Sequence, residues 1–252
     1  MPTFKELERI DEIVKTGITL LDTNVLYFRG KNEGNLVDDL YDCRRLKEVP
    51  YDALDNNIRY TTLLRRMIEK GNVFFVDGVG NELEDFLGAF DGGSEYLSGR
   101  ARNRGHINER VSKLRFFKDG IKSLLKTVNG HNVDRCFDSK QRERLREIKE
   151  ALYGESKRLR LKDDGDYENH TDEDIGVAAF LLHFANNSVT NVVSLDQHAR
   201  SLIRFLFEDG FEKFSGFLTD LQPAETNRRI LELHGFDKER GLICLERYTE
   251  VS

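Results

Sequence analysis

The sequence predicts an α/β domain built on parallel strands, with a helical insertion. The first observation is the stretch at residues 18–27, an apolar and partly β-branched run that leads into Asp22 and two small polar residues. Buried parallel strands place an acid at the carboxyl edge of a sheet in this way. Two later apolar stretches, at residues 73–76 and 192–195, likewise lead toward an acid. Helical periodicity accounts for most of the remaining chain, which completes the α/β assignment.

The composition suits a single globular domain. The chain has 252 residues, enough to bury a sizeable core, with 38% hydrophobic and 33% charged residues. No apolar run approaches the length of a membrane span, and the N-terminus lacks the basic and apolar segments of a secretion signal. The three cysteines lack the spacing of a zinc signature or a disulfide framework. We therefore expect one domain over residues 1–252, located in a reducing cytoplasm.

Charge is distributed unevenly along the chain. The formal net charge of −6 by itself argues against a nucleic-acid partner. Residues 97–162, however, contain 19 Lys and Arg against 8 Asp and Glu, so the remainder is strongly acidic. A basic surface beside an acidic, cation-binding centre produces such an asymmetry. The alternative is a set of solvated helices with an excess of Lys and Arg.

The N-terminal part of the chain indicates helices on either side of the first strand. Residues 4–15 carry apolar side chains at helical spacing, and Gly17 ends this amphipathic helix before the strand begins. Further helices are expected over residues 36–46 and 53–70, with Pro50 between them. These helices lead into the second buried strand.

A new helix begins at Val79. Glu82 borders the apolar face of this helix, and the breaker sequence at residues 91–94 ends it. Residues 97–162 follow as basic helices with a turn signal at residues 129–132. Strand patterns resume only after this segment. We therefore interpret it as a helical insertion in the α/β domain and not as an independent domain.

The strand and helix alternation then resumes around two more acidic positions. A helix rich in small and apolar residues begins at Thr171, and Asp172 and Asp174 lie in its first turn. Residues 189–195 indicate the next strand, which leads directly into Asp196 and a following helix. All these acids therefore lie at strand ends and helix starts, which favours a metal site over a salt-bridged surface.

The remaining residues, at about 211–252, are expected to form a C-terminal extension of helix and strand. A helix is expected over residues 225–235, and an edge strand over residues 241–248. This extension carries none of the acids described above.

The acidic motifs, taken in order along the chain, resemble those of the PIN-domain nucleases. They are Leu20-Leu21-Asp22-Thr23-Asn24-Val25-Leu26, Val79-x-x-Glu82-Leu83, Asp172-x-Asp174-Ile175-x-x-Ala178-Ala179 and Val193-Ser194-Leu195-Asp196. The basic segment between the second and third motifs is longer than in compact members of the family. The resemblance implies a three-layer α/β/α sandwich with a mostly parallel central sheet. It also implies an acidic pocket at the carboxyl ends of the strands.

The resemblance further implies hydrolysis of a phosphodiester with Mg²⁺ or Mn²⁺. Asp22, Glu82, Asp174 and Asp196 carry over as catalytic metal ligands, and Asp172 is the alternative or additional third acid. Carboxylates suit hard divalent cations, and a bound metal activates water and neutralises charge on the leaving oxygen. Each acid also has a plain structural interpretation. Asp22 and Asp196 would then cap helices, and Glu82 would be a solvated helix charge.

Polar residues beside the acids are candidates for orienting them. Asn24 matches the small polar residue that follows the first acid in the family, and Ser194 lies where the family has Thr or Ser. Asn24 equally suits a turn at a strand end. His198 is less convincing as a general base, because a histidine early in a helix is more often a surface residue and the metal makes such a base unnecessary.

The proposed partner is RNA, bound through the basic segment at 97–162. Arg100, Arg102 and Arg104 are the candidate substrate-binding residues, since they lie in a glycine-flanked stretch that can follow a phosphate backbone. RNA cleavage is the commonest activity of the family, so we expect an endoribonuclease acting on single-stranded or unpaired RNA. The family also implies a homodimer. The alternative function is a non-catalytic PIN-like module that binds RNA or protein, although a full set of acids argues against it.

Overall fold

The computed structural model describes most of the chain. For residues 93–100 and 105–108 the description covers the backbone alone. The described residues are 3–27, 51–100, 105–159, 170–185, 188–219, 221, 229–237 and 239–249.

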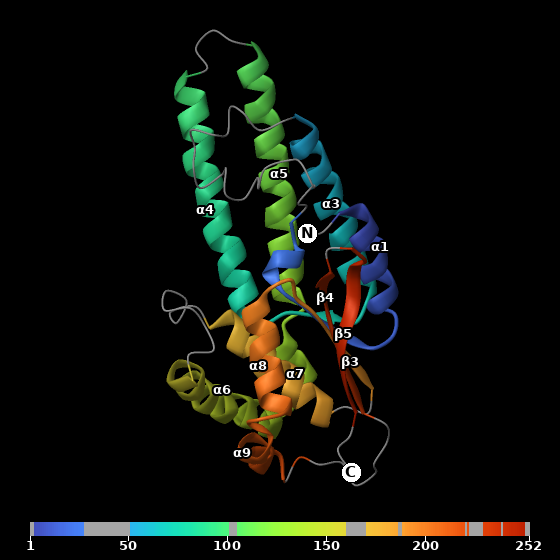
Figure 1. Ribbon diagram of the computed structural model, residues 1–252. Coiled ribbons are helices and arrows are strands. Elements are labelled where there is room, and N and C mark those ends of the chain that lie inside the picture. Colours follow the sequence, from blue (N-terminus) through green and yellow to red (C-terminus); the bar gives the residue numbers. More distant parts are fainter. Residues whose placement is uncertain are drawn as a thin grey trace.

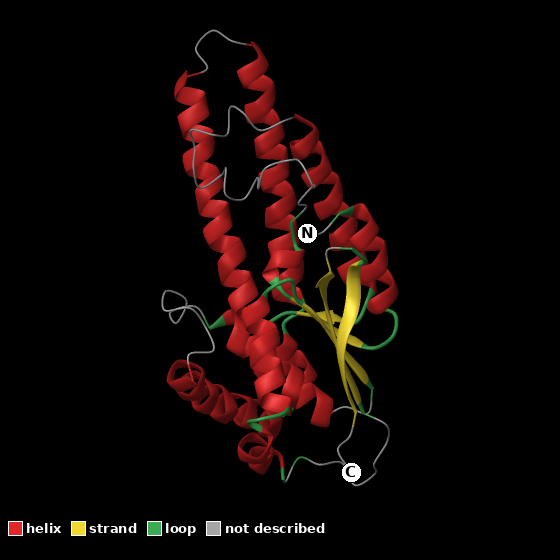
Figure 2. Ribbon diagram, in the orientation of Figure 1, coloured by secondary structure: helices red, strands yellow, loops and turns green. Residues whose placement is uncertain are grey.

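One mostly parallel sheet lies at the centre of the described structure. Its strand order is β2-β1-β3-β4-β5, and every neighbouring pair is parallel except β4 and β5. Figure 2 shows the strands as a single twisted sheet beside long helices. The prediction of an α/β fold with a mostly parallel sheet is therefore confirmed. The strands are β1 (Ile18–Leu21), β2 (Val73–Phe74), β3 (Val189–Val193), β4 (Ile230–Asp237) and β5 (Gly241–Thr249).

Helices cover both faces of the sheet, and the central strand is buried on both sides. The four residues from Thr190 to Val193 in β3 are fully buried, although successive side chains of a strand point to opposite faces. Toward one face, the Asn191 amide donates a 3.1 Å hydrogen bond to the Thr16 hydroxyl, just beyond helix α1 (Phe4–Ile13). Helix α7 (Thr171–Ala185) contacts β3 and β4. Figure 1 shows the sheet lying between α1 and α7.

Long helices extend from the sheet along one side of the molecule. They are α3 (Tyr51–Lys70), α4 (Asp77–Arg100) and α5 (Gly105–Gly130). Helix α5 packs against both α3 and α4, and α4 and α5 reach well beyond the sheet (Figure 1). The expected helix over residues 53–70 is present as α3.

The breaker predicted at residues 91–94 is wrong, because α4 continues through it to Arg100. Phe86 and Phe90 on α4 are buried, and the Phe90 ring packs edge-on against Phe117 of α5 with 5.3 Å between centroids. Two glycines cost a helix roughly 1 kcal/mol each, whereas burying one large aromatic side chain contributes about 2 kcal/mol or more. Packing between α4 and α5 therefore overrides the local breaker.

The basic segment supplies two differently placed helices. After α5, a short 3₁₀ turn leads into α6 (Ser139–Leu159), which matches the expected second basic helix. Helix α6 packs against α7 and not against α3 or α4 in the main contacts between elements. Helix α5 of the basic segment thus pairs with α4, and helix α6 lies beside the acidic first turn of α7.

The helix predicted over residues 225–235 is wrong where the structure describes it, because β4 occupies Ile230–Asp237. Leu231 and Leu233 are fully buried and Ile230 and Glu232 are only partly buried, which is the two-residue period of a strand. Leu233 pairs with Val192 of β3. The expected edge strand is present as β5, so this C-terminal segment completes the central sheet.

The remaining elements connect the sheet to its covering helices. Helix α8 (Gln197–Phe207) packs on α7, and the short α9 (Phe211–Ser215) follows it. Short 3₁₀ turns are η1 (Thr23–Val25), η2 (Val133–Cys136) and η3 (Gly216–Leu218). Among the residues that the structure describes, we find no helix combining the length and the apolar character that a bilayer crossing requires.

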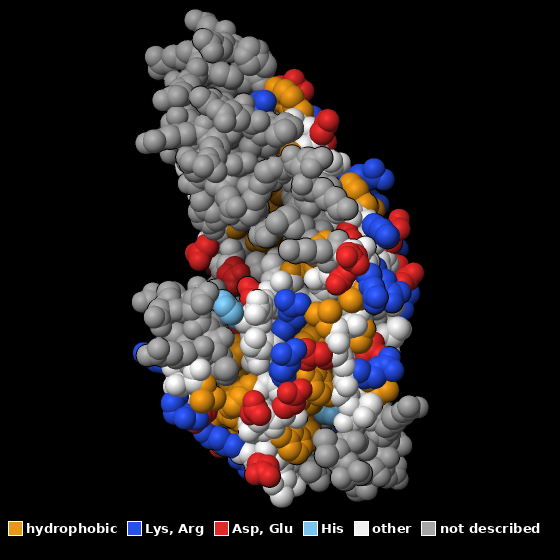
Figure 3. Space-filling view, in the orientation of Figure 1, with side chains coloured by type: hydrophobic (Ala, Val, Ile, Leu, Met, Phe, Trp, Pro, Cys, Tyr) orange, Lys and Arg blue, Asp and Glu red, His pale blue; other side chains and the backbone are white. Residues whose placement is uncertain are grey.

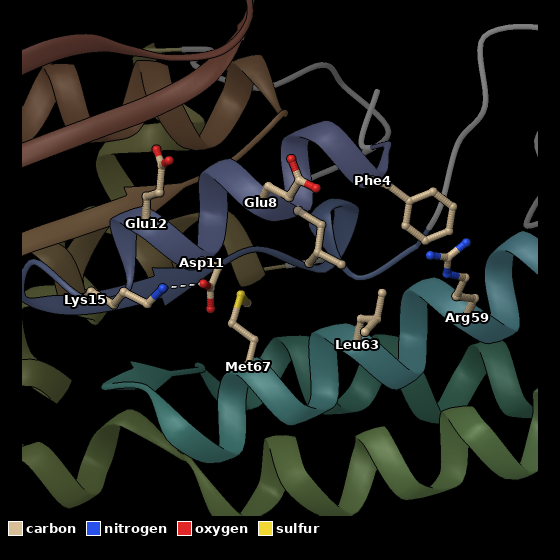
Figure 4. Close-up of a pocket in the computed structure, with 9 residues that line it drawn as sticks. Phe4, Glu8, Asp11, Glu12, Lys15, Arg59, Leu63 and Met67 are labelled. Carbon is tan, nitrogen blue, oxygen red and sulfur yellow. Dashed lines mark hydrogen bonds and ion pairs between the residues drawn. The ribbon is translucent and has the colours of Figure 1, made fainter.

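A surface groove of about 520 Å³ separates α1 from α3 (Figure 4). Phe4, Leu63 and Met67 form its apolar part, and the Arg59 guanidinium lies 4.8 Å from the centroid of the Phe4 ring. The acids of the four motifs do not contribute to its lining. This groove therefore belongs to the helical layer and not to the carboxyl edge of the sheet.

Candidate metal centre

The centre of the candidate site is Asp22, at the carboxyl end of β1. Its backbone N–H donates to the Val193 carbonyl at 3.1 Å, so β1 and β3 are still paired where both strands end. The Ser194 N–H donates in turn to the His234 carbonyl of β4 at 3.1 Å. The carboxyl ends of β1 and β3 therefore lie at one level, beside His234 of β4. This alignment brings the first and fourth motifs together at the buried Asp22 side chain, which is 4% exposed.

The Asp22 carboxylate is held by the two residues that the sequence suggested as orienting groups. Its Oδ2 atom accepts hydrogen bonds from Asn24 Nδ2 at 2.5 Å and from Ser194 Oγ at 2.6 Å. Asn24 Oδ1 accepts from the Leu195 N–H at 3.0 Å, and Ser194 Oγ accepts from the Asp196 N–H at 3.0 Å. The network thus ties the end of β1 to the loop after β3 and fixes the direction of the carboxylate.

Burial raises the pKa of Asp22 from 3.8 to about 6. The hydrogen bond from Ser194 opposes this rise, whereas the negative charges of Glu82 and Asp196 add to it. Acids from two further motifs are therefore close enough to repel the Asp22 carboxylate. A buried carboxylate with like-charged neighbours has strong affinity for a cation, because a cation relieves both the desolvation and the repulsion.

Glu82 lies where α4 and α7 begin side by side. With Asp174 of α7 it lines a hollow of about 430 Å³. The close approach depends on Gly78, since a Cβ atom at that position would lie only 2.3 Å from Thr171 Oγ1. The first turn of α4 can therefore pack against the first turn of α7 only with glycine there. This contact brings the second and third motifs together.

Asp174 is held by side chains of α6. Tyr153 donates its hydroxyl to Asp174 Oδ1 at 2.6 Å, and the Lys149 ammonium lies 3.1 Å from the same oxygen. The neighbouring acid, Glu173, is fully buried and accepts from Ser156 Oγ at 2.9 Å. Helix α6 is thus anchored to the acidic turn of α7 by a tyrosine, a lysine and a serine.

Sequence reasoning missed Lys149 and Tyr153. Their spacing of four residues places them on one side of a helix, which the sequence does show. Their contact with α7, however, depends on how α6 packs in the tertiary structure, and no local sequence pattern predicts that packing. Lys149 is also one of many Lys and Arg residues in this segment, so the sequence did not distinguish it from its neighbours.

Asp172 lies with Asp196 and His198 in a second group. One ligand atom from each of these three residues lies within 4.8 Å of the other two. Asp196 also caps α8, because its Oδ1 accepts the His198 N–H at 2.6 Å. Capping, which was the plain structural interpretation of Asp196, therefore coexists with a place in the acidic cluster. The structure brings each alternative third acid beside another acid, Asp174 beside Glu82 and Asp172 beside Asp196.

The donor atoms of this centre fit a hard divalent cation. Apart from the imidazole of His198, the candidate ligand groups are carboxylates, and oxygen donors select Mg²⁺, Mn²⁺ or Ca²⁺ over softer metals. The negative charges of Glu82 and Asp196 both act on the buried Asp22. The arrangement is thus suited to hold a cation at the edge of the sheet.

The candidate substrate-binding arginines cannot be placed with respect to this centre. Arg100 is the last residue of α4, and its side chain lies outside the described atoms. Arg102 and Arg104 lie outside the described residues altogether. On the described face in Figure 3, Lys and Arg side chains are interspersed with Asp and Glu.

Comparisons with known proteins identify no relative. No family model, no curated protein and no solved structure matches this chain.

The raised pKa of Asp22 predicts how the metal-free protein responds to pH. Between about pH 4 and pH 6 the native state keeps a proton that the unfolded chain has released. Stability therefore falls as pH rises through this window, by about 3 kcal/mol in total. Asp22→Asn removes this contribution. In EDTA at pH 7.5 the variant should melt at a higher temperature than wild type, and the difference should vanish below pH 4.

Thermal unfolding of both proteins from pH 3.5 to pH 8 measures this difference directly, because all other titrating groups are shared. Adding Mg²⁺ or Mn²⁺ at pH 7.5 should stabilise wild type and leave Asp22→Asn unchanged. Identical pH profiles for the two proteins would mean that the pKa of Asp22 is the same in the folded and unfolded states, which contradicts this account.

Proposed function

We propose that the protein is a divalent-metal-dependent nuclease that hydrolyses RNA phosphodiester bonds. The observation that carries this proposal is the buried Asp22 carboxylate, whose pKa is raised to about 6 by burial and by Glu82 and Asp196. Such a carboxylate lies at the shared carboxyl edge of parallel strands, where α/β folds bind ligands. The motif order and the acid set support a PIN-like, three-layer arrangement.

Asp22, Glu82, Asp196 and one or both of Asp172 and Asp174 would hold the cation. When bound, Mg²⁺ or Mn²⁺ supplies an acidified water molecule and charge neutralisation for phosphodiester hydrolysis. These five side chains come from four separate stretches of the chain. A site built from them would therefore depend on the whole fold and not on one local motif.

The polar residues around the acids perform the positioning that such a reaction needs. Asn24 and Ser194 hold one oxygen of Asp22, which directs the carboxylate without neutralising it. Tyr153 and Lys149 hold one oxygen of Asp174. Fixed ligands avoid reorganisation when charge develops in the transition state, which is a main source of enzymatic rate enhancement.

RNA is the substrate proposed for this centre, through the positive charge of residues 97–162 and the arginines at 100, 102 and 104. An acidic centre repels a polyanion unless cations lie nearby, and the basic segment supplies them. Part of this segment, helix α6, is docked directly on α7 beside the acids. The proposal includes single-stranded or unpaired RNA, a cytoplasmic location and a homodimer, in line with the family that the motifs resemble.

One observation favours a second candidate, a PIN-like module that binds RNA or protein without cutting. The Lys149 ammonium lies 3.1 Å from Asp174 and partly neutralises it. An acid that is already paired is a weaker metal ligand. The two candidates differ in whether a divalent cation displaces Lys149 from Asp174.

The decisive experiment is cleavage of a labelled single-stranded RNA in Mn²⁺, Mg²⁺ or EDTA. We expect cleavage in either metal and none in EDTA. Asp22→Asn should lower the rate by at least a hundredfold, because loss of a charge at the centre of a metal site removes several kcal/mol of transition-state stabilisation. Asp209→Asn, which changes an exposed acid in the turn after α8, is the matched control and should cleave normally.

The result against the proposal is cleavage that survives in Asp22→Asn or in EDTA. Absence of cleavage by wild type, together with RNA binding that needs no metal, would instead support the non-catalytic module.

Substitutions on α6 should change the dependence of cleavage on metal concentration in opposite directions. Lys149→Met removes a cation that competes for Asp174, so half-maximal cleavage should need roughly fivefold less Mg²⁺. Tyr153→Phe removes a hydrogen bond to the charged carboxylate, so it should need roughly tenfold more. Rate measurements across a Mg²⁺ titration test both variants.

Lys140→Met, at the far end of α6 from this contact, serves as the charge-matched control for Lys149→Met. Equal Mg²⁺ requirements in all four proteins would show that α6 does not position the third acid.

A further inference from the structure

A second group of metal-binding side chains lies on the β4–β5 hairpin. Glu232 and His234 are two residues apart on β4 and therefore point to the same face. A register shift after Leu233 places Cys244 of β5 opposite His234. One ligand atom from each of Glu232, His234 and Cys244 lies within 4.8 Å of the other two. None of these residues belongs to the acidic motifs.

His234 has the chemistry of a metal ligand. Its side chain is buried, and Nε2 lies 3.2 Å from Asn191 Oδ1. The Asn191 amide nitrogen donates to Thr16 Oγ1, which leaves Oδ1 as the atom facing the imidazole. An amide oxygen only accepts hydrogen bonds, so Nε2 carries the proton and Nδ1 carries a lone pair.

That lone pair has no partner. Nδ1 of His234 is buried and lacks a hydrogen-bond partner among the described residues. Leaving a buried polar atom unsatisfied is destabilising, so such atoms call for a physical explanation. Burial also lowers the pKa of His234 to about 4, which keeps the imidazole neutral at physiological pH. Metal binding requires this neutral form.

The other two residues supply charge and access. Glu232 Oε2 lies 3.5 Å from His234 Nε2, and the same carboxylate pairs with Arg247 on β5. Cys244 is exposed, and its thiol donates to the Glu246 carbonyl at 3.3 Å. A cation can therefore approach from solvent and displace the thiol proton. Arg247 holds Glu232 in place beside the imidazole.

We propose that Glu232, His234 and Cys244 form a Zn²⁺ site on the β4–β5 hairpin. One oxygen, one imidazole nitrogen and one thiolate are donors that select zinc over Mg²⁺ or Ca²⁺. Tetrahedral zinc with bonds of about 2.0–2.3 Å needs ligand atoms about 3.5 Å apart. Side-chain rotations that turn the Glu232 carboxylate and the Cys244 thiol toward Nδ1 of His234 would close the group around an ion. Three protein ligands leave the fourth position for water.

The ion would fasten the antiparallel edge strand to the parallel sheet. Among the described strands, β5 pairs with β4 alone and forms an edge of the sheet, and edge strands are prone to open. A ligand bound only by the native state stabilises it by mass action. This site is independent of the proposed nuclease activity, since its members lie outside the acidic centre.

Cobalt titration of the metal-free, untagged protein tests the site. Co²⁺ bound to a thiolate gives a charge-transfer absorption band in the near ultraviolet, and Zn²⁺ should displace it at one ion per chain. Cys244→Ser should abolish the band and weaken Zn²⁺ binding at least a hundredfold by competition with a fluorescent chelator. Cys244 is exposed, so this variant should fold normally, which circular dichroism verifies.

Two controls separate this site from other metal binding. Cys136→Ser, which changes the half-buried cysteine of η2, should keep the band. Asp22→Asn should also keep it, because the acidic centre contributes no thiolate. A missing band in wild type, or a band that survives in Cys244→Ser, would overturn the proposal.

Discussion

The structure depends on one constraint, which is that like-charged carboxylates are gathered where parallel strands end. Asp22 is almost fully buried, and Glu82 and Asp196 are near enough to raise its pKa. Such a cluster opposes folding unless other groups direct and stabilise it. The hydrogen bonds from Asn24 and Ser194 do so at Asp22, and they also bind the ends of β1 and β3 together. The same bonds therefore hold the acid and the sheet edge.

Helix starts reinforce this arrangement. Asp174 lies in the first turn of α7, Glu82 follows shortly after the start of α4, and Asp196 caps α8. The positive end of a helix dipole stabilises a nearby carboxylate by about 0.3–1 kcal/mol. Three helices thus begin around the acidic edge and offset part of the repulsion. The remainder is repulsion that a bound cation would relieve.

Helix α6 completes the centre from outside. Helix α6 places Tyr153 and Lys149 on Asp174, and Ser156 on the buried Glu173. A segment rich in Lys and Arg is therefore part of the acidic site, and it contributes structural contacts as well as charge. These contacts from α6 help to stabilise an acidic cluster whose own motifs contain no Lys or Arg.

Much of the sheet edge and of its acidic residues was predictable from local sequence patterns. The strands before Asp22 and Asp196 are apolar runs that end in acids, and parallel pairing alone brings such ends together. Asn24 and Ser194 were identified because they match positions at which the family that the motifs resemble has small polar residues. The predictions that failed depended on distant contacts. Phe90 packing on Phe117 carries α4 through two glycines, and pairing of Leu233 with Val192 makes a strand of a segment with helical residues.

The docking of Tyr153 and Lys149 was beyond prediction for the same reason. Their partner, Asp174, lies 21 residues after Tyr153 and 25 residues after Lys149 in the sequence. No pattern in the intervening sequence predicts that α6 and α7 pack together. Long-range packing decides such contacts.

The most direct test of the central claim is anomalous diffraction from crystals of the protein soaked in Mn²⁺. The account predicts a manganese peak within coordination distance of the carboxylates of Asp22 and Asp196, and loss of that peak in Asp22→Asn crystals. Well-ordered crystals with no peak beside Asp22, or with manganese bound only elsewhere, would contradict it.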